Sequence, residues 1–142
     1  MQHLQELRVV ITAAASGLGS VIATTLSKNG SKVFICDNDK LALRKFSEKN
    51  PTINCFHADV SNESQMKEFF EGIKDQFKEI DVLINNAGIS GSSAKVEDFD
   101  FKDWKNTIKI NLNGTFLSTK LAIPLLKNKG GSIINMGSTS SF

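Results

Sequence analysis

The chain reads RVVITAAASGLG from Arg8 to Gly19, an apolar run that passes into small residues and ends in two glycines. A short β-branched run of this kind predicts a buried strand. The apolar residues that follow are spaced as on one face of a helix: Leu18, Val21, Ile22 and Leu26. Gly30 stands where a glycine commonly ends a helix. The stretch therefore predicts a strand, a tight turn and a helix, which is the first unit of a parallel α/β fold.

Apolar runs alternate with amphipathic ones along the rest of the chain. The strand candidates are Arg8 to Ile11, Lys32 to Cys36, Ile53 to His57, Val82 to Ile84 and Ser132 to Met136. Continuous apolar runs are typical of strands that are covered on both faces. We expect an α/β fold with a Rossmann-like, doubly wound parallel sheet in the order 3-2-1-4-5, truncated after strand five. Ligands of such sheets bind at the carboxyl ends of the strands, beside strand one.

Three further helices are expected between these strands. The second helix spans Asn38 to Lys49 and is closed off by Pro51. Ser61 is the expected cap of the third, whose apolar stripe comprises Met66, Phe69, Phe70, Ile73 and Phe77. The fourth is a long helix from Phe101 to Asn128, with Pro124 near its end. All 142 residues are thus expected to form one dinucleotide-binding unit, incomplete at its carboxyl end.

Composition excludes several classes of protein. With 17 basic and 15 acidic residues the net charge is +2, and 40% of the residues are hydrophobic, so disorder and a basic nucleic-acid-binding face are both disfavoured. No run of 18 apolar residues predicts a membrane span, and the start lacks the order of a signal peptide, which favours the cytoplasm. Cys36 and Cys55 lie in apolar runs and are expected to be buried free thiols.

The turn after the first strand is the first candidate site. Small residues there let a pyrophosphate approach the backbone N–H groups at the positive end of the following helix. The candidate cofactor contacts in this turn are Thr12, Ser16, Gly17, Leu18 and Gly19. Tight packing of strand against helix is the alternative explanation for the glycines.

Asp37 supports the dinucleotide interpretation. It directly follows the second strand, about 20 residues past the glycines, where an acid accepts hydrogen bonds from the adenosine ribose. The same carboxylate would repel a 2′-phosphate, so NAD is preferred over NADP, although Lys40 would soften this preference if it folded back. The alternative role of Asp37 is that of an acid at the start of the second helix.

Five separated motifs together resemble the short-chain dehydrogenase/reductase family. They are Thr12 to Gly19, Asp59-Val60 after the third strand, Asn85 to Gly88 after the fourth, Asn111 within INLNG, and Ser138 after the fifth. They occur in the family's order and spacing over essentially all of the chain. The resemblance implies hydride transfer between a nicotinamide and a small-molecule carbonyl or alcohol, and a homodimer or homotetramer of the whole protein.

The resemblance also assigns roles to residues. Asp59 and Val60 match the adenine contacts, and Asn86, Ala87 and Gly88 match the segment that lies along the cofactor. Ser138 matches the serine that binds the substrate carbonyl oxygen, and Asn111 the position that holds a proton-relay water. Each has a plainer alternative: a capped turn, an Asn-rich turn, a surface serine in a hydroxyl-rich tail, or a satisfied polar residue on a helix face.

Two features depart from the family pattern. Ala13 replaces the usual first glycine, which would cost about 1 kcal/mol if that position has positive φ. The family's Tyr-x-x-x-Lys pair, expected about a dozen residues after Ser138, does not occur, because the chain has no Tyr. We therefore expect the N-terminal part of a longer reductase, inactive alone. The alternative is a non-catalytic dinucleotide-binding module or a redox-sensing partner subunit.

Overall fold

Five parallel strands form one sheet. The structure is a computed structural model, and it describes residues 6–126 and 130–138. The strands are β1 (Arg8–Thr12), β2 (Lys32–Asp37), β3 (Asn54–His57), β4 (Val82–Asn85) and β5 (Ser132–Asn135). Their order is β3-β2-β1-β4-β5, so the predicted order is confirmed. The bounds differ from the expected ones by one residue at most: Asp37, for example, is the last residue of β2.

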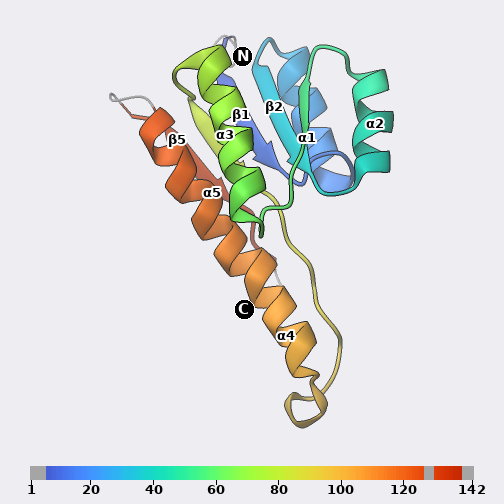
Figure 1. Cartoon of the computed structure of the whole chain (residues 1–142). Helices are drawn as coiled ribbons and strands as arrows, with labels where there is room; N and C mark the ends of the chain where they lie inside the picture. The colour runs from blue at the N-terminus through green and yellow to red at the C-terminus, as the bar shows by residue number, and fades with distance from the viewer. Residues whose placement is uncertain (1–5, 127–129, 139–142) are drawn as a thin grey trace.

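Helices cover both faces of this sheet (Figure 1). They are α1 (Gly17–Lys28), α2 (Lys40–Lys49), α3 (Glu63–Phe77), α4 (Phe101–Ile108) and α5 (Thr115–Ala122), with a π-helical segment η3 (Lys109–Gly114) and 3-10 turns η2 (Val96–Asp98) and η4 (Ile123–Leu125). Within residues 6–126 and 130–138, every helix is too short or too polar to span a bilayer.

Alternation along the strands divides the core into two clusters. Val10 and Phe34 lie with the apolar stripe of α3 and with Ala122 of α5, whereas Val9 and Ile35 lie with α1 and α2. Neighbouring strand residues point to opposite faces of a sheet, so a continuous apolar run feeds both clusters. The stripe predicted for the third helix is confirmed, with Phe77 partly buried at its end.

The fourth helix is not the continuous helix that was expected. It is interrupted by η3 and ends in the turn η4 at Leu125, while Asn128 lies outside the described residues. Gly114 is the last residue of η3, and a Cβ there would lie 2.8 Å from Val60 Cγ2. The helix passes so close to the turn after β3 that the contact requires glycine, and π-helical turns are frequent at functional sites.

Two helix starts also differ from expectation. Asn62, not Ser61, caps α3: its side chain accepts a hydrogen bond from the backbone N–H of Gln65 at 3.2 Å. The second helix begins at Lys40, two residues later than predicted, with Asp39 as its cap. In both places two adjacent polar residues competed for the cap, and residue type alone did not decide between them.

Burial departs from the sequence pattern in two elements. Leu18 and Val21, predicted for the core face of α1, are 59% and 60% exposed. The helix instead approaches the sheet through the small residues Gly19 and Ala23, which are buried. Strand β5, whose apolar run is typical of a strand covered on both faces, is exposed along its whole length, as the expected incomplete carboxyl end predicts.

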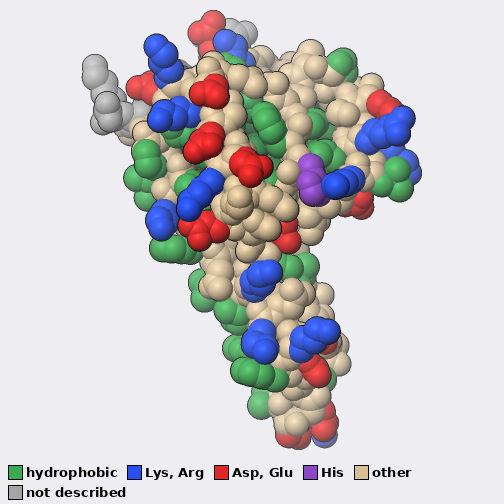
Figure 2. Space-filling view, viewed as in Figure 1, with side chains coloured by type: hydrophobic (Ala, Val, Ile, Leu, Met, Phe, Trp, Pro, Cys, Tyr) green, Lys and Arg blue, Asp and Glu red, His purple; other side chains and the backbone are tan. Residues whose placement is uncertain are grey.

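Helix α4 and the segment of residues 89–100 before it form an arm that extends beyond the carboxyl edge of the sheet (Figure 1). Hydrophobic side chains gather on one flank of this arm (Figure 2). Phe101 and Trp104 are 69% and 53% exposed. The arm therefore presents apolar surface next to the edge where parallel sheets bind ligands.

Candidate cofactor site

The turn between β1 and α1 is tied to the end of β4 through Thr12. This residue is buried, and its hydroxyl oxygen accepts hydrogen bonds from the backbone N–H groups of Asn86 and Ala87, at 3.1 Å each. Thr12 was predicted as a cofactor contact. Its observed contacts are internal, and they hold the carboxyl ends of two neighbouring strands in register.

Asn86 completes this connection from the other side. Its amide donates hydrogen bonds to the carbonyl oxygens of Thr12 and Ala13, at 3.1 and 2.8 Å. A Cβ at Gly19 would lie 2.6 Å from the Asn86 amide nitrogen and 2.7 Å from the Ala13 carbonyl oxygen. Only glycine fits there, so tight packing of the turn is itself a sufficient reason for this residue.

The strained residue of the turn is Ala13. Its φ is +51°, so the position does require a left-handed conformation, which costs an L-residue about 1 kcal/mol. Gly17, also left-handed with a φ of +54°, begins α1 after the extended residue Ser16. Ser16, Gly17 and Leu18 are exposed, so the first turn of α1 faces solvent, where backbone N–H groups can bind an anion.

Asp37 is buried beneath the same turn. One carboxylate oxygen accepts a hydrogen bond from the backbone N–H of Ala15 at 3.0 Å, and the other accepts one from Asp39 at 2.9 Å. Each oxygen retains further lone pairs for a ligand. The two backbone bonds fix the orientation of the carboxylate relative to the turn.

Asp59 and Val60 follow β3. One carboxylate oxygen of Asp59 accepts hydrogen bonds from the Ser61 backbone N–H and hydroxyl, at 2.8 and 2.7 Å. The backbone N–H of Asp59 donates a hydrogen bond to the side-chain oxygen of Gln65. Val60 is buried against Gly114. The alternative role given for these two residues, a capped turn, is therefore present in the structure. Both residues also line a cleft.

This cleft has a volume of about 110 Å³. Its lining residues are Ala13, Asp37, Asn38, Ala58, Asp59, Val60, Ala87, Gly88, Ile89 and Ile110. Five of them are predicted cofactor contacts, contributed by the ends of β2, β3 and β4. Sequence reasoning missed the other five, although each is adjacent in the chain to a predicted residue. The lining carries two carboxylates and no lysine or arginine.

The two predicted catalytic residues lie outside this lining. Asn111 is in η3, where its side chain accepts a hydrogen bond from the Ile89 N–H at 2.9 Å and donates one to the Ile89 carbonyl at 2.8 Å. Ser138 is exposed, three residues after β5. Asn85 holds the end of β5 in two ways. Its side-chain amide donates a hydrogen bond to the Asn135 side-chain oxygen at 2.8 Å, and its backbone carbonyl accepts one from the Met136 N–H at 2.9 Å.

Neither cysteine is ionised in this environment. Burial raises the pKa of Cys36, below the glycine turn, to about 12, and burial raises that of Cys55 to about 11. Both are free thiols, but Cys55 is half-buried, so its expected full burial is wrong. Reactive thiols have lowered pKa values, and these two cysteines therefore add no nucleophile to the site.

Comparison with known proteins identifies the family. The model of the short chain dehydrogenase family matches residues 8–142. An uncharacterized oxidoreductase, YxbG of Bacillus subtilis, is 37% identical over 99% of this chain and 53% of its own length, and a 3beta-hydroxysteroid dehydrogenase of Mediterraneibacter gnavus is 31% identical over 99% and 52%.

Solved structures agree with this assignment. The crystal structure of gox2181 superimposes with a TM-score of 0.90 at 28% identity, over 96% of this chain and 55% of that one. Aldohexose dehydrogenase of Thermoplasma acidophilum gives 0.83 at 31%, over 96% and 51%. The chain spans about half the length of these relatives, and it belongs to the short-chain dehydrogenase family.

Proposed function

We propose that the whole protein is an NAD(H)-dependent oxidoreductase that transfers hydride between the nicotinamide and a carbonyl or alcohol substrate. The observation that carries this proposal is the cleft at the carboxyl edge of the sheet, where Asp37, Asp59 and Val60 lie together. The small residues Ala87 and Gly88 complete the wall beside them. The nicotinamide supplies the hydride chemistry, and the protein supplies binding, orientation and proton delivery.

The preference for NAD follows from charge. A 2′-phosphate beside the buried Asp37 carboxylate would be repelled, and the ten lining residues include no basic side chain to neutralise it. A ribose 2′-hydroxyl would instead donate a hydrogen bond to that carboxylate, which the Ala15 N–H already holds in place. We therefore propose NAD as the cofactor, with the adenosine held between Asp37 and the pair Asp59-Val60.

Ser138 is the proposed hydrogen-bond donor to the substrate oxygen. It lies three residues after β5, and Asn85 holds the end of that strand through its side chain and its backbone carbonyl. The side-chain amide of Asn111 is bonded to the backbone of Ile89, and the backbone carbonyl of Asn111 accepts the Thr115 hydroxyl at 2.7 Å. We propose that this backbone carbonyl would also hold the relay water. Residues 1–142 contain no Tyr, so proton delivery by the family's Tyr-x-x-x-Lys pair is proposed for the whole protein only.

A fluorescence titration of this chain with NADH and with NADPH tests the cofactor. NADH should bind at least about tenfold more tightly, because an unfavourable charge contact of about 1.4 kcal/mol corresponds to that ratio. Asp37→Asn keeps the shape, removes the charge and should abolish the preference. Asp39→Asn is the matched control, since Asn preserves the helix cap and the residue lies outside the cleft lining. Equal or tighter NADPH binding by the unmodified chain would contradict the proposal.

The catalytic role of Ser138 is tested in the whole protein. Ser138→Ala should leave the NADH dissociation constant unchanged and lower kcat by about two orders of magnitude, as loss of an oxyanion donor does. Ser132→Ala, at the opposite end of the same strand, should change neither. Retained turnover in Ser138→Ala would remove this serine from the mechanism, while cofactor binding would still be judged separately.

A further inference from the structure

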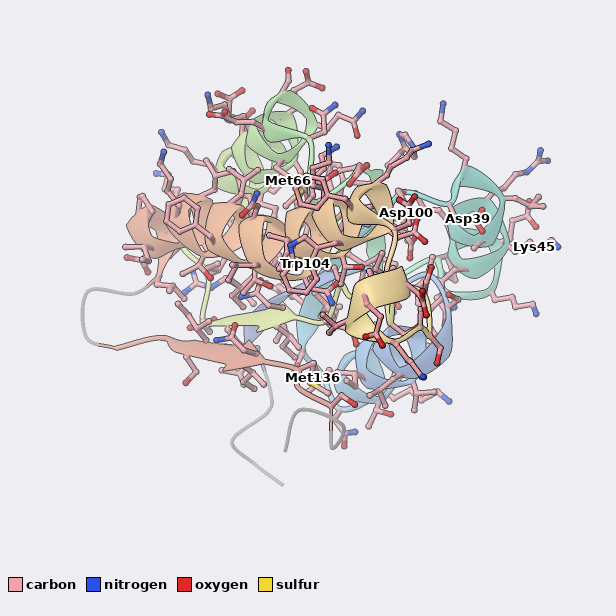
Figure 3. The ribbon with its side chains drawn as sticks, turned by 90° about the horizontal axis from the view of Figure 1, so that it is seen from below. Asp39, Lys45, Met66, Asp100, Trp104 and Met136 are labelled. Atoms are coloured by element: carbon pink, nitrogen blue, oxygen red, sulfur yellow. The ribbon has the colours of Figure 1, made fainter. Side chains whose placement is uncertain are left out.

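Helices α1 and α2 lie side by side on one face of the sheet, with a groove between them (Figure 1). The groove has a volume of about 400 Å³, which is within the range of small-molecule sites. Helix α1 packs on β1 and β2, and α2 packs on β2 and β3, so the groove is far from the exposed edge strand β5. Lys45, which lines the groove, lies on the opposite side of the molecule from β5 and Met136 (Figure 3).

One wall of the groove is cationic. Lys45 and Lys49 of α2 are exposed and four residues apart, so they lie on the same face of the helix. The lining contains no Asp or Glu. Helix α1 has no acidic residue, and the single acid within α2, Glu48, pairs with Arg44 at 3.1 Å. Within the described part of the chain, the two lysines therefore line the groove without an ion-pair partner.

The opposite wall offers hydrogen-bond acceptors. The Ser20 hydroxyl donates its hydrogen to the Gly17 carbonyl at 2.8 Å, and the Thr24 hydroxyl donates its own to the Ser20 carbonyl at 2.9 Å. Both hydroxyl oxygens keep lone pairs for a group that donates. At the end of α2, the amide of Asn50 donates to the Phe46 carbonyl at 2.9 Å and keeps a second N–H. The groove thus combines cationic donors on one wall with neutral acceptors on the other.

We propose that this groove binds a small phosphorylated organic molecule that carries hydroxyl groups, such as a sugar phosphate. Phosphate oxygens would accept charge-assisted hydrogen bonds from Lys45 and Lys49. Hydroxyl groups of the ligand would donate to Ser20 and Thr24, and its carbon skeleton would lie over the buried ring of Phe46. Like charges four residues apart destabilise a helix, so a bound phosphate would also remove an unfavourable interaction within α2.

The groove is distinct from the cofactor cleft. The two linings have no residue in common, so both sites can be occupied at once. Ala15 is the point of closest connection, because it lines the groove while its backbone N–H donates to the Asp37 carboxylate at 3.0 Å. The inference is therefore independent of the proposed oxidoreductase function.

Isothermal titration calorimetry of this chain with glucose 6-phosphate tests the site. Binding should be saturable and at least about tenfold tighter than that of D-glucose, which lacks the charge-assisted hydrogen bonds. Lys45→Gln and Lys49→Gln should each weaken the affinity for glucose 6-phosphate by about tenfold for the same reason. Lys74→Gln is the matched control: this lysine is exposed on α3, on the other face of the sheet, and its replacement should leave the affinity unchanged.

The acceptor wall is tested with Thr24→Val, which keeps the shape of the side chain and removes its lone pairs. This variant should weaken glucose 6-phosphate binding by about fivefold and leave the affinity for inorganic phosphate unchanged. Inorganic phosphate that binds as tightly as glucose 6-phosphate would overturn the assignment to an organic ligand.

Three other results would overturn the site itself: no saturable heat with glucose 6-phosphate, equal losses in Lys45→Gln and Lys74→Gln, or competition between glucose 6-phosphate and NADH. Competition would mean that the phosphate binds at the glycine turn, because the groove and the cofactor cleft share no lining residue. Glucose 6-phosphate binding that depends on Lys45 and Lys49 would support the groove whether or not NADH binds.

Discussion

Strands β1 and β5 belong to the same parallel sheet and have similar apolar sequences, but their surroundings differ. Val9, Val10 and Ile11 of β1 are at most 1% exposed, whereas Ile133 and Ile134 of β5 are 37% and 45% exposed. Strand β1 is central and has helices on both faces, while β5 forms one edge of the described sheet. The apolar pattern of a strand indicates which of its side chains can be buried. Whether they are buried depends on the elements that pack against the strand.

Truncating one large side chain in each region should give the largest contrast. Phe34→Ala in β2 removes a fully buried ring and should lower the free energy of unfolding by about 4 kcal/mol. Ile134→Ala in β5 should cost less than about 1 kcal/mol, because the side chain is already 45% exposed. Urea unfolding followed by circular dichroism measures both. Equal costs would show that β5 is covered in solution, for example by a second copy.

Adding one methyl group to a glycine in each region gives the next contrast. Gly19→Ala would place a Cβ 2.7 Å from the Ala13 carbonyl oxygen and should cost about 2 kcal/mol and weaken NADH binding. Gly137→Ala, after β5, has no atom within 4 Å of the added Cβ and should be nearly neutral. Unfolding and NADH titrations on the same samples check both expectations. A neutral Gly19→Ala would mean that the glycine turn is looser than its contacts indicate.

The sheet with its cleft and the segment from the arm to η3 differ in how well the sequence predicts them. Strand order, the first three helices and the meeting of Asp37, Asp59 and Gly88 in one cleft follow from local pattern, since crossovers are right-handed and parallel strands end at one edge. The interruption at η3 does not follow from the local apolar spacing, and the close contact beside it joins Gly114 to Val60, which are far apart in the chain. Long-range contacts likewise decide the exposure of Leu18 and the course of the arm.

Alkaline pH should destabilise the buried region selectively. Burial raises the pKa of Cys36 from 9.0 to about 12, so the folded state keeps its proton while the unfolded state loses it. Stability is therefore full below pH 9 and falls between pH 9 and 12, by about 1.4 kcal/mol at pH 10. Urea unfolding at pH 8 and 10 measures this loss, and Cys36→Ala should reduce it. Cys55, with its pKa raised from 9.0 to about 11, titrates over the same range and adds its own loss at pH 10, which should persist in this variant. An unchanged pH dependence in Cys36→Ala would place the titrating group elsewhere.

Exchanging glycine and alanine should have opposite signs in the two regions. Ala13→Gly relieves a left-handed conformation that costs about 1 kcal/mol but adds backbone entropy to the unfolded chain, for a net gain of about 0.5 kcal/mol. Gly130→Ala, before β5, meets no neighbouring atom, yet its φ of +111° should make it cost about 1 kcal/mol or more.

Thermal unfolding measures both variants, with Ala14→Gly as the control for Ala13→Gly. Ala14 is buried, adjacent in the chain, and has no positive φ, so its replacement should only destabilise. If Ala13→Gly is stabilising and also strengthens NADH binding, then the strain of the turn opposes cofactor binding. If it is stabilising and weakens NADH binding, the alanine holds the turn in the conformation that binds the cofactor, because a glycine there would sample more backbone conformations before binding. A loss of stability equal to that of Ala14→Gly would mean that the left-handed conformation of Ala13 carries no strain.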